Sequence, residues 1–184
     1  PVSEKLRKKN IEVLYFLDER DEFVSGILGT YADKPFQSVS KGDLDLDSEE
    51  EKKALEEKAT ENKDMLDAMK EDLKDKVTEV RISSRLSEND PVCITAAEGV
   101  SLEMEKYMSQ DPMNGGNGPK ASKILEINPD HPIFAKLKEV YKDNPEQLKD
   151  YADVLFNQAM LIQGLPIDDP VGYARKIAEL LVKA

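Results

Sequence analysis

The chain has 184 residues, of which 39% are hydrophobic and 35% charged, enough for one ordinary domain with a small extra subdomain. Its formal net charge of −12 repels phosphate backbones and anionic lipid headgroups, which disfavours nucleic acid and membrane surfaces as partners. Aromatic residues make up only 6%, too few to line a large pocket with rings. A single cysteine, Cys93, cannot form an intrachain disulfide and favours a reducing, cytoplasmic compartment.

The first 46 residues predict a small βαβ-like piece. Residues 12–17 form a compact apolar run typical of a short strand, and residues 35–39 read as another. Between them, Phe23, Ile27 and Leu28 fall at helical spacing. One such unit leaves both strand edges open and buries little by itself. We therefore expect residues 1–46 to be the end of a larger domain.

From residue 48 the composition indicates a long helix. Ser48 is well placed as its cap, and Glu49, Glu50 and Glu51 complement the dipole of its first turn. The apolar stripe that follows is too thin for a fully buried helix, so one side is expected to face water. The stripe consists of Leu55, Ala59, Met65 or Leu66, Met69 and Leu73.

Two β-prone runs come next, at residues 77–86 and 92–94, with Asn89, Asp90 and Pro91 as the turn between them. Residues 100–108 return to helical composition and end before a glycine-rich loop. One side of this short helix is apolar, and methionine is an adaptable residue that suits surfaces for varied partners. Packing into the chain's own core is the alternative. The apolar side is Val100, Met104, Tyr107 and Met108.

The last two predicted helices are the best defined. The first spans about residues 145–163, and the second begins with Asp169 as cap and Pro170 in its first turn. Their apolar residues exceed what one packed face needs, which favours burial against a second chain in a four-helix bundle. Packing only on the same domain is the alternative. The predicted dimer interface is Leu148, Tyr151, Ala152, Leu155, Ala159, Ile162, Ala174, Ile177, Ala178 and Leu181.

The sequence contains no group of residues that is typical of a catalytic site. Acidic pairs abound by chance in so acidic a chain, and none has an apolar setting that would shift its pKa. His131 is the only histidine and reads as a structural or capping residue beside Asp130 and Pro132. The sequence thus predicts no catalytic, metal or cofactor site.

Several separated motifs resemble one family. They are Ile-Glu-Val-Leu at 11–14, Asp-Glu-Phe at 21–23, Lys-Pro-Phe-Gln-Ser-Val at 34–39, Ser-Arg-Leu at 84–86, Ile-Asn-Pro-Asp-His-Pro at 127–132 and Asp-Val-Leu-Phe-Asn-Gln-Ala at 153–159. In this order and spacing, they make the chain similar to the ninety-kilodalton heat-shock chaperones, over essentially its whole length.

The resemblance implies that residues 1–46 end the family's middle domain and that residues 47–184 are its C-terminal dimerisation domain. It implies that the domain that binds and hydrolyses ATP with Mg lies upstream, so that this chain is no enzyme and holds no cofactor. In bacterial members the short amphipathic helix contacts client proteins, and the matching positions are Val100, Met104, Tyr107 and Met108. The chain ends without the acidic tail that docks helical-repeat co-chaperones in eukaryotic members.

Together these observations predict an α+β fold. A small sheet with flanking helices carries a C-terminal helix pair that forms an intermolecular four-helix bundle, and a small α/β piece precedes it. The expected function is a homodimerisation module of an ATP-dependent cytoplasmic chaperone whose partners are a second copy of itself and unfolded clients. The alternative is an independent adaptor domain that binds one defined protein.

Overall fold

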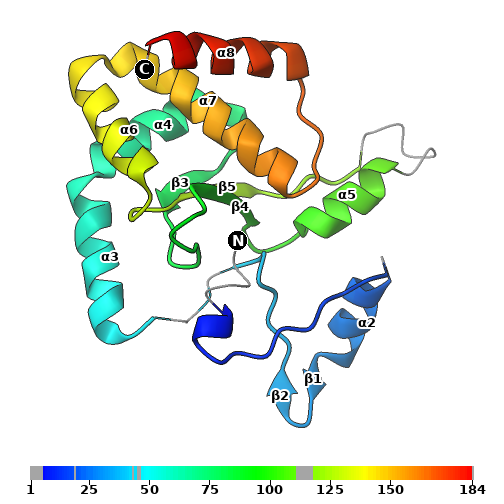
Figure 1. The fold of residues 1–184 in the computed structure, drawn as a ribbon. Helices are drawn as coiled ribbons and strands as arrows, with labels where there is room; N and C mark the ends of the chain where they lie inside the picture. Colours follow the sequence, from blue (N-terminus) through cyan, green and yellow to red (C-terminus); the bar gives the residue numbers. More distant parts are fainter. Residues whose placement is uncertain (1–5, 19, 43, 45–46, 111–117, 184) are drawn as a thin grey trace.

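The computed structural model describes residues 6–18, 20–42, 44, 47–110 and 118–183. Helices surround a small central sheet, and the N-terminal residues form a separate layer beneath it (Figure 1). The fold is mixed α and β. The expected intermolecular four-helix bundle and the boundary at residues 46 and 47 stay predictions, because a single chain tests neither.

The described residues of the N-terminal piece include a helical turn at residues 6–8, the helix α2 (Asp21–Leu28) and a minimal antiparallel hairpin, β1 (Thr30–Tyr31) with β2 (Lys34–Pro35). The predicted strand at residues 12–17 is wrong: the segment is extended but pairs with no described strand, and most of it is exposed. The predicted strand at 35–39 is also wrong, because it shares only Pro35 with β2 and residues 36–39 form no strand. A strand needs a neighbour to bond its backbone groups, and apolar composition alone does not supply one.

The predicted long helix is two helices, α3 (Glu49–Glu61) and α4 (Lys63–Leu73), divided at Asn62. Ser48 caps α3 as predicted, and it forms a reciprocal capping box with Glu51. Asn62 is buried, and its side-chain amide donates to the carbonyl of Lys58 at 2.7 Å, which satisfies the backbone where α3 ends. The break lets α3 stay exposed while α4 packs inward.

The central sheet has three strands in the order β3-β5-β4 (Glu79–Ile82, Lys123–Ile127 and Val92–Ala96). β5 runs parallel to β3 and antiparallel to β4. The two predicted β-prone runs both form strands but are not neighbours, because β5 inserts between them. Parallel β3 and β5 are joined by a long excursion that includes β4 and α5 (Leu102–Gln110).

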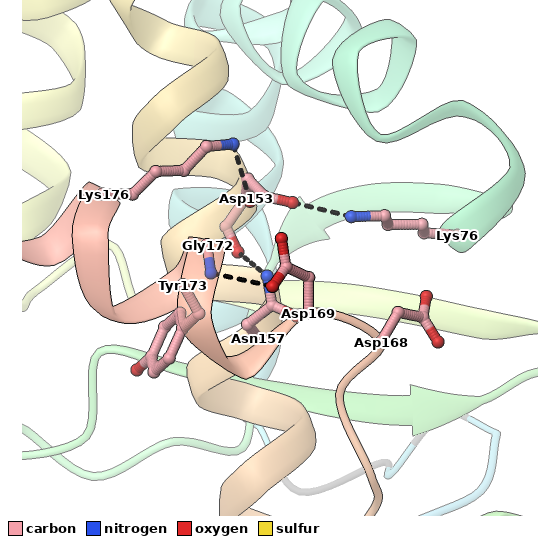
Figure 2. Close-up of a pocket in the computed structure, with 8 residues that line it drawn as sticks. All are labelled: Lys76, Asp153, Asn157, Asp168, Asp169, Gly172, Tyr173 and Lys176. Atoms are coloured by element: carbon pink, nitrogen blue, oxygen red, sulfur yellow. Dashed lines mark hydrogen bonds and ion pairs between the residues drawn. The ribbon is translucent and has the colours of Figure 1, made fainter.

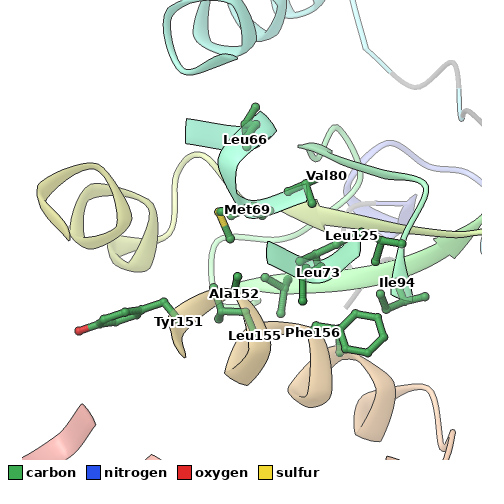
Figure 3. Packing of buried hydrophobic residues seen from close by; sticks show 14 of the residues in the cluster. Leu66, Met69, Leu73, Val80, Ile94, Leu125, Tyr151, Ala152, Leu155 and Phe156 are labelled. Carbon is green, nitrogen blue, oxygen red and sulfur yellow. The ribbon is translucent and has the colours of Figure 1, made fainter. Parts of the chain in front are cut away.

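One face of the sheet carries the hydrophobic core. Val80, Leu125 and Ile94 lie in register across the three strands and face α4 and α7 (Pro145–Ile162). Figure 3 shows these side chains meeting Met69 and Phe156 from the two helices. Alternation in β4 and β5 sends every second side chain to this face. The opposite face is polar.

Two further helices complete the domain. α6 (Pro132–Asp143) packs on α7 through its buried residues Phe134, Leu137 and Val140. α8 (Pro170–Lys183) lies on the outside of α7, away from the sheet (Figure 1). Within the described ranges, no helix combines the length and the apolar character that crossing a membrane requires.

Candidate interaction site

α8 docks on α7 with one side and leaves the other side bare. Its inner side is half-buried and consists of Tyr173, Lys176, Ile177 and Leu180. Asp169 starts the helix as predicted, since its carboxylate accepts a hydrogen bond from the Gly172 N–H at 2.8 Å. The approach of Gly172 to Asp169 is so close that a Cβ there would collide with the carboxylate. The helix start is therefore fixed in position.

An ion cluster holds α8 against the rest of the domain (Figure 2). The carboxylate of Asp153 on α7 accepts from Lys176 of α8 at 2.8 Å and from Lys76 at 2.7 Å. Partial burial opposes ionisation of Asp153, but the two ammonium groups outweigh it and hold its pKa below the ordinary value. Asn157 lies one turn further along α7 and bonds back to the Asp153 carbonyl at 2.8 Å.

The seam between α7 and α8 contains a cleft of about 100 Å³. Ligand pockets usually enclose about 300–1,000 Å³. The cleft is lined mainly by the ion cluster and by Asp168, Asp169 and Tyr173. It is a polar packing seam between two helices rather than a small-molecule site. Among the described residues, no three His, Cys, Asp or Glu side chains gather in a way that could hold a metal ion.

The predicted dimer residues divide into two groups in the structure. Five of the six on α7 are buried in the core of the same chain: Leu148, Tyr151, Ala152, Leu155 and Ala159. These five face the chain's own sheet and helices, so they are not available to a second chain. Sequence periodicity locates an apolar face but does not say which surface covers it. Ile162, the sixth, is 46% exposed at the end of α7, beside exposed Leu161.

The α8 outer stripe is an apolar surface of the terminal helices that no described residue of this chain covers. Of the predicted residues, Ala174, Ala178 and Leu181 are exposed on it, while Ile177 is half-buried at its border. Val171 and Val182 extend the stripe and were not among the predicted interface residues. The sequence pattern could have identified these two residues, because apolar residues recur every three or four positions along α8. The stripe is defined as Val171, Ala174, Ala178, Leu181 and Val182.

The predicted client-contact residues lie together on and before α5. Val100 is half-buried against the core, Met104 and Met108 are half-buried, and Tyr107 is 44% exposed. The Tyr107 ring meets the ring of Phe23 edge-on, with 6.1 Å between centroids. This apolar side is thus partly covered, on one flank by the N-terminal piece.

His131 caps α6, in agreement with its predicted structural role. Its ring Nδ1 accepts from the Ile133 N–H at 3.1 Å. The neighbouring Asp130 pairs with Lys58 of α3 at 2.8 Å. Cys93 is buried, and burial beside the Glu126 carboxylate raises the pKa of its thiol, so the thiolate is strongly disfavoured.

Comparison with known proteins assigns the class. The family model for HSP90, described as Hsp90 protein, matches residues 1–184. The chain is 43% identical over 182 residues to the chaperone protein HtpG of Bacillus subtilis (strain 168), covering 99% of this chain and 29% of that protein. It is 46% identical over 181 residues to the chaperone protein HtpG of Clostridium acetobutylicum, covering 98% and 28%. The chain therefore belongs to the Hsp90 family of heat-shock chaperones, and it spans less than a third of the length of these relatives.

The family match corrects one prediction. The sequence predicts that the family's ATP-hydrolysing domain is absent and that the chain is therefore no enzyme. The match contradicts this, because it covers residues 1–184 and leaves no ground for excluding the ATPase from the chain. The expectation that the chain binds no ATP or Mg rested on the same assumed absence of the ATP-hydrolysing domain, and it is withdrawn for the same reason.

Proposed function

We propose that this chain is the dimerisation module of an HtpG-like, ATP-dependent chaperone of the bacterial cytoplasm, comprising the end of the middle domain and the C-terminal domain. Its partners would be a second copy of itself and unfolded or partly folded clients. The observation that carries the proposal is the α8 outer stripe, an apolar helix face without a partner on a domain whose other terminal helix, α7, is already buried.

The α8 outer stripe fits a two-fold partner. It has Ala178 at its centre and larger apolar residues, Val171 and Leu181, toward its ends. In an isologous dimer the same stripe meets itself, and small central residues allow two helices to approach closely. Leu161 and Ile162 at the end of α7 add apolar area that the chain itself leaves exposed. We propose that these residues, rather than the buried stripe of α7, form the bundle.

Cysteine crosslinking tests this arrangement. Ala178→Cys places a thiol at the centre of the proposed contact, while Ala135→Cys places one on the exposed surface of α6 as a matched control. Near a two-fold axis a residue meets its own copy, so a short bifunctional thiol reagent should link Ala178→Cys chains into covalent dimers at low protein concentration. The control should remain uncrosslinked. Equal yields for the two variants would count against the interface.

α5 is proposed as the client contact through Met104, Tyr107 and Met108, with Val100 anchoring the helix to the core. The supporting observation is that Tyr107 stays exposed beside two half-buried methionines, on a helix joined to the core mainly through Leu102 and Val100. Soft side chains in a shallow surface can adapt to different apolar segments.

Binding to several unrelated unfolded proteins tests the client surface. Met104→Ser with Met108→Ser should weaken binding to all of them, while Met65→Leu, a volume-conserving change in the buried core, should leave binding as it is. Dimerisation should be unaffected in both variants. Tight binding to one protein only would indicate an adaptor, and an unchanged client affinity would leave the methionines with a packing role alone.

A further inference from the structure

The polar face of the sheet carries a buried charged cluster that the proposed function does not use. At its centre is Glu126, in the middle of β5, with a side chain that is 1% exposed. Its carboxylate accepts hydrogen bonds from Arg81, Ser83, Arg85 and Thr95 at 2.8 to 3.2 Å. A buried carboxylate needs such partners, because an unpaired charge away from water is costly.

Arg85, a member of this cluster, also contacts residues before the expected domain boundary. Its side chain is also 1% exposed. Nε donates to Glu126 at 3.0 Å, while Nη1 donates to the carbonyl of Val39 at 3.0 Å and Nη2 to the carbonyl of Gly42 at 2.6 Å. The planar guanidinium thus bridges the sheet and the segment that leads away from the N-terminal piece.

The same segment lies along the open edge of β4. The Ala96 N–H donates to the carbonyl of Ser40 at 3.0 Å, and the Gly42 N–H donates to the carbonyl of Ala96 at 3.0 Å. Lys41 and Ala96 form a parallel bridge. Gly42 has φ +64°, a left-handed conformation that suits glycine. We name residues 39–42 the edge clasp.

We propose that Arg85 is a positioning residue that holds the edge clasp on β4 and thereby sets the placement of the N-terminal piece relative to α5. The two carbonyls complete the hydrogen bonding of a buried cation, so the clasp is held or released as a unit rather than loosened gradually. Two contacts carry its position to α5: the Ser40 hydroxyl donates to Glu103 at 3.1 Å, and Phe23 packs on Tyr107. The proposal depends neither on the dimer nor on client binding.

Amide hydrogen exchange of the whole chain tests this role. Arg85→Lys keeps the charge but replaces the three donor nitrogens of the guanidinium, which each reach a different acceptor, with one nitrogen that cannot span them. The Gly42 and Ala96 amides should therefore exchange at least about tenfold faster, the effect of losing a charged hydrogen bond. Thr95→Val is the matched control. Thr95 lies on β4 next to Ala96, and its replacement removes a hydrogen bond to Glu126 but no hydrogen bond of the edge clasp. In Thr95→Val, the amides of Gly42 and Ala96 should exchange at the rates of the parent. The Thr78 amide, bonded to Lys123, reports on the rest of the sheet.

Unchanged exchange at Gly42 and Ala96 in Arg85→Lys would overturn the proposal, as would equal acceleration in Thr95→Val. If Arg85→Lys does not fold, Gly42→Val decides, because it strains the clasp at φ +64° and leaves the buried cluster in place. Spin labels at Ile27→Cys and Ala135→Cys should then give a broad distance distribution in place of the parent's narrow one. A folded Gly42→Val chain with the narrow distribution of the parent would contradict the role of the clasp.

Discussion

The two parts of the molecule use their apolar residues in opposite ways. In the described part of residues 47–183 most large apolar side chains are buried in one core on a face of the three-stranded sheet, and the exposed ones lie mainly on α8 and at the end of α7. In residues 6–42 most of them are exposed, among them Leu14, Phe16, Leu17 and Ile27. The difference lies in topology rather than in composition, because a hairpin of two-residue strands and short helical segments offer no second layer against which to bury a face. Among the described residues, the contacts between the two parts include the edge clasp with Arg85, the Phe23–Tyr107 pair and the ion pairs of Lys9 with Asp47 and Glu51.

The largest expected effect contrasts one residue from each part. Leu125 is fully buried at the centre of the sheet, and Leu125→Ala should lower the free energy of unfolding by about 2–5 kcal/mol because it leaves a cavity. Ile27 is 86% exposed, and Ile27→Ala should change the free energy of unfolding by less than about 0.5 kcal/mol. Urea unfolding followed by circular dichroism measures both. Comparable losses would mean that residue 27 is buried in solution, which would erase the contrast between the two parts.

A smaller effect concerns the attachment of α8. The pKa of Asp153 is lowered in the folded chain from its ordinary value of 3.8, so its contribution to stability is full above that value and is lost as the pH falls through the folded pKa. Asp153→Asn should cost about 1 kcal/mol at neutral pH. The difference between parent and variant in urea unfolding should shrink as the pH is lowered from about 5 to about 2. A difference that is constant over this range would contradict the ion cluster.

The smallest effect is local to α3. Ser48→Ala removes one half of the capping box and should cost about 1 kcal/mol of helix stability. Since α3 has no buried residue, the loss should appear as faster amide exchange in its first turn rather than as a lower global stability. Hydrogen bonds from Ser48 and Lys9 hold the pKa of Glu51 at about 2, so acidification below its ordinary value of 4.5 should fray the same turn in the parent. Uniform exchange along α3 would argue against the cap.

Local signals in the sequence predicted local structure well. Ser48, Asp169 and Pro170 mark helix starts where the structure has them, because capping depends on a few neighbouring atoms. Pairing between distant segments was not predictable in this way. No local pattern in the sequence indicates that β5 inserts between β3 and β4, or that residues 12–17 have no strand partner among the described residues, because both depend on long-range contacts.

The same limit applies to the candidate surfaces. Helical periodicity located the apolar faces of α7 and α8 but could not tell a face buried in its own domain, such as that of Leu155, from one left bare, such as that of Leu181. In the sequence, Arg85 is distinguished only as part of the Ser-Arg-Leu motif at 84–86. Its role depends on two backbone carbonyls more than forty positions away, for which no side-chain pattern exists.

Sedimentation equilibrium over a concentration series tests the central claim most directly, with Leu181→Glu as the interface variant and Ala135→Glu as the control of equal charge change. Leu181 is 74% exposed in the single chain, so both variants should fold. We expect the parent and the control to be dimers and Leu181→Glu to be a folded monomer. A parent that stays monomeric at high concentration, or a Leu181→Glu chain that dimerises as the parent does, would contradict the proposed dimer through the α8 outer stripe.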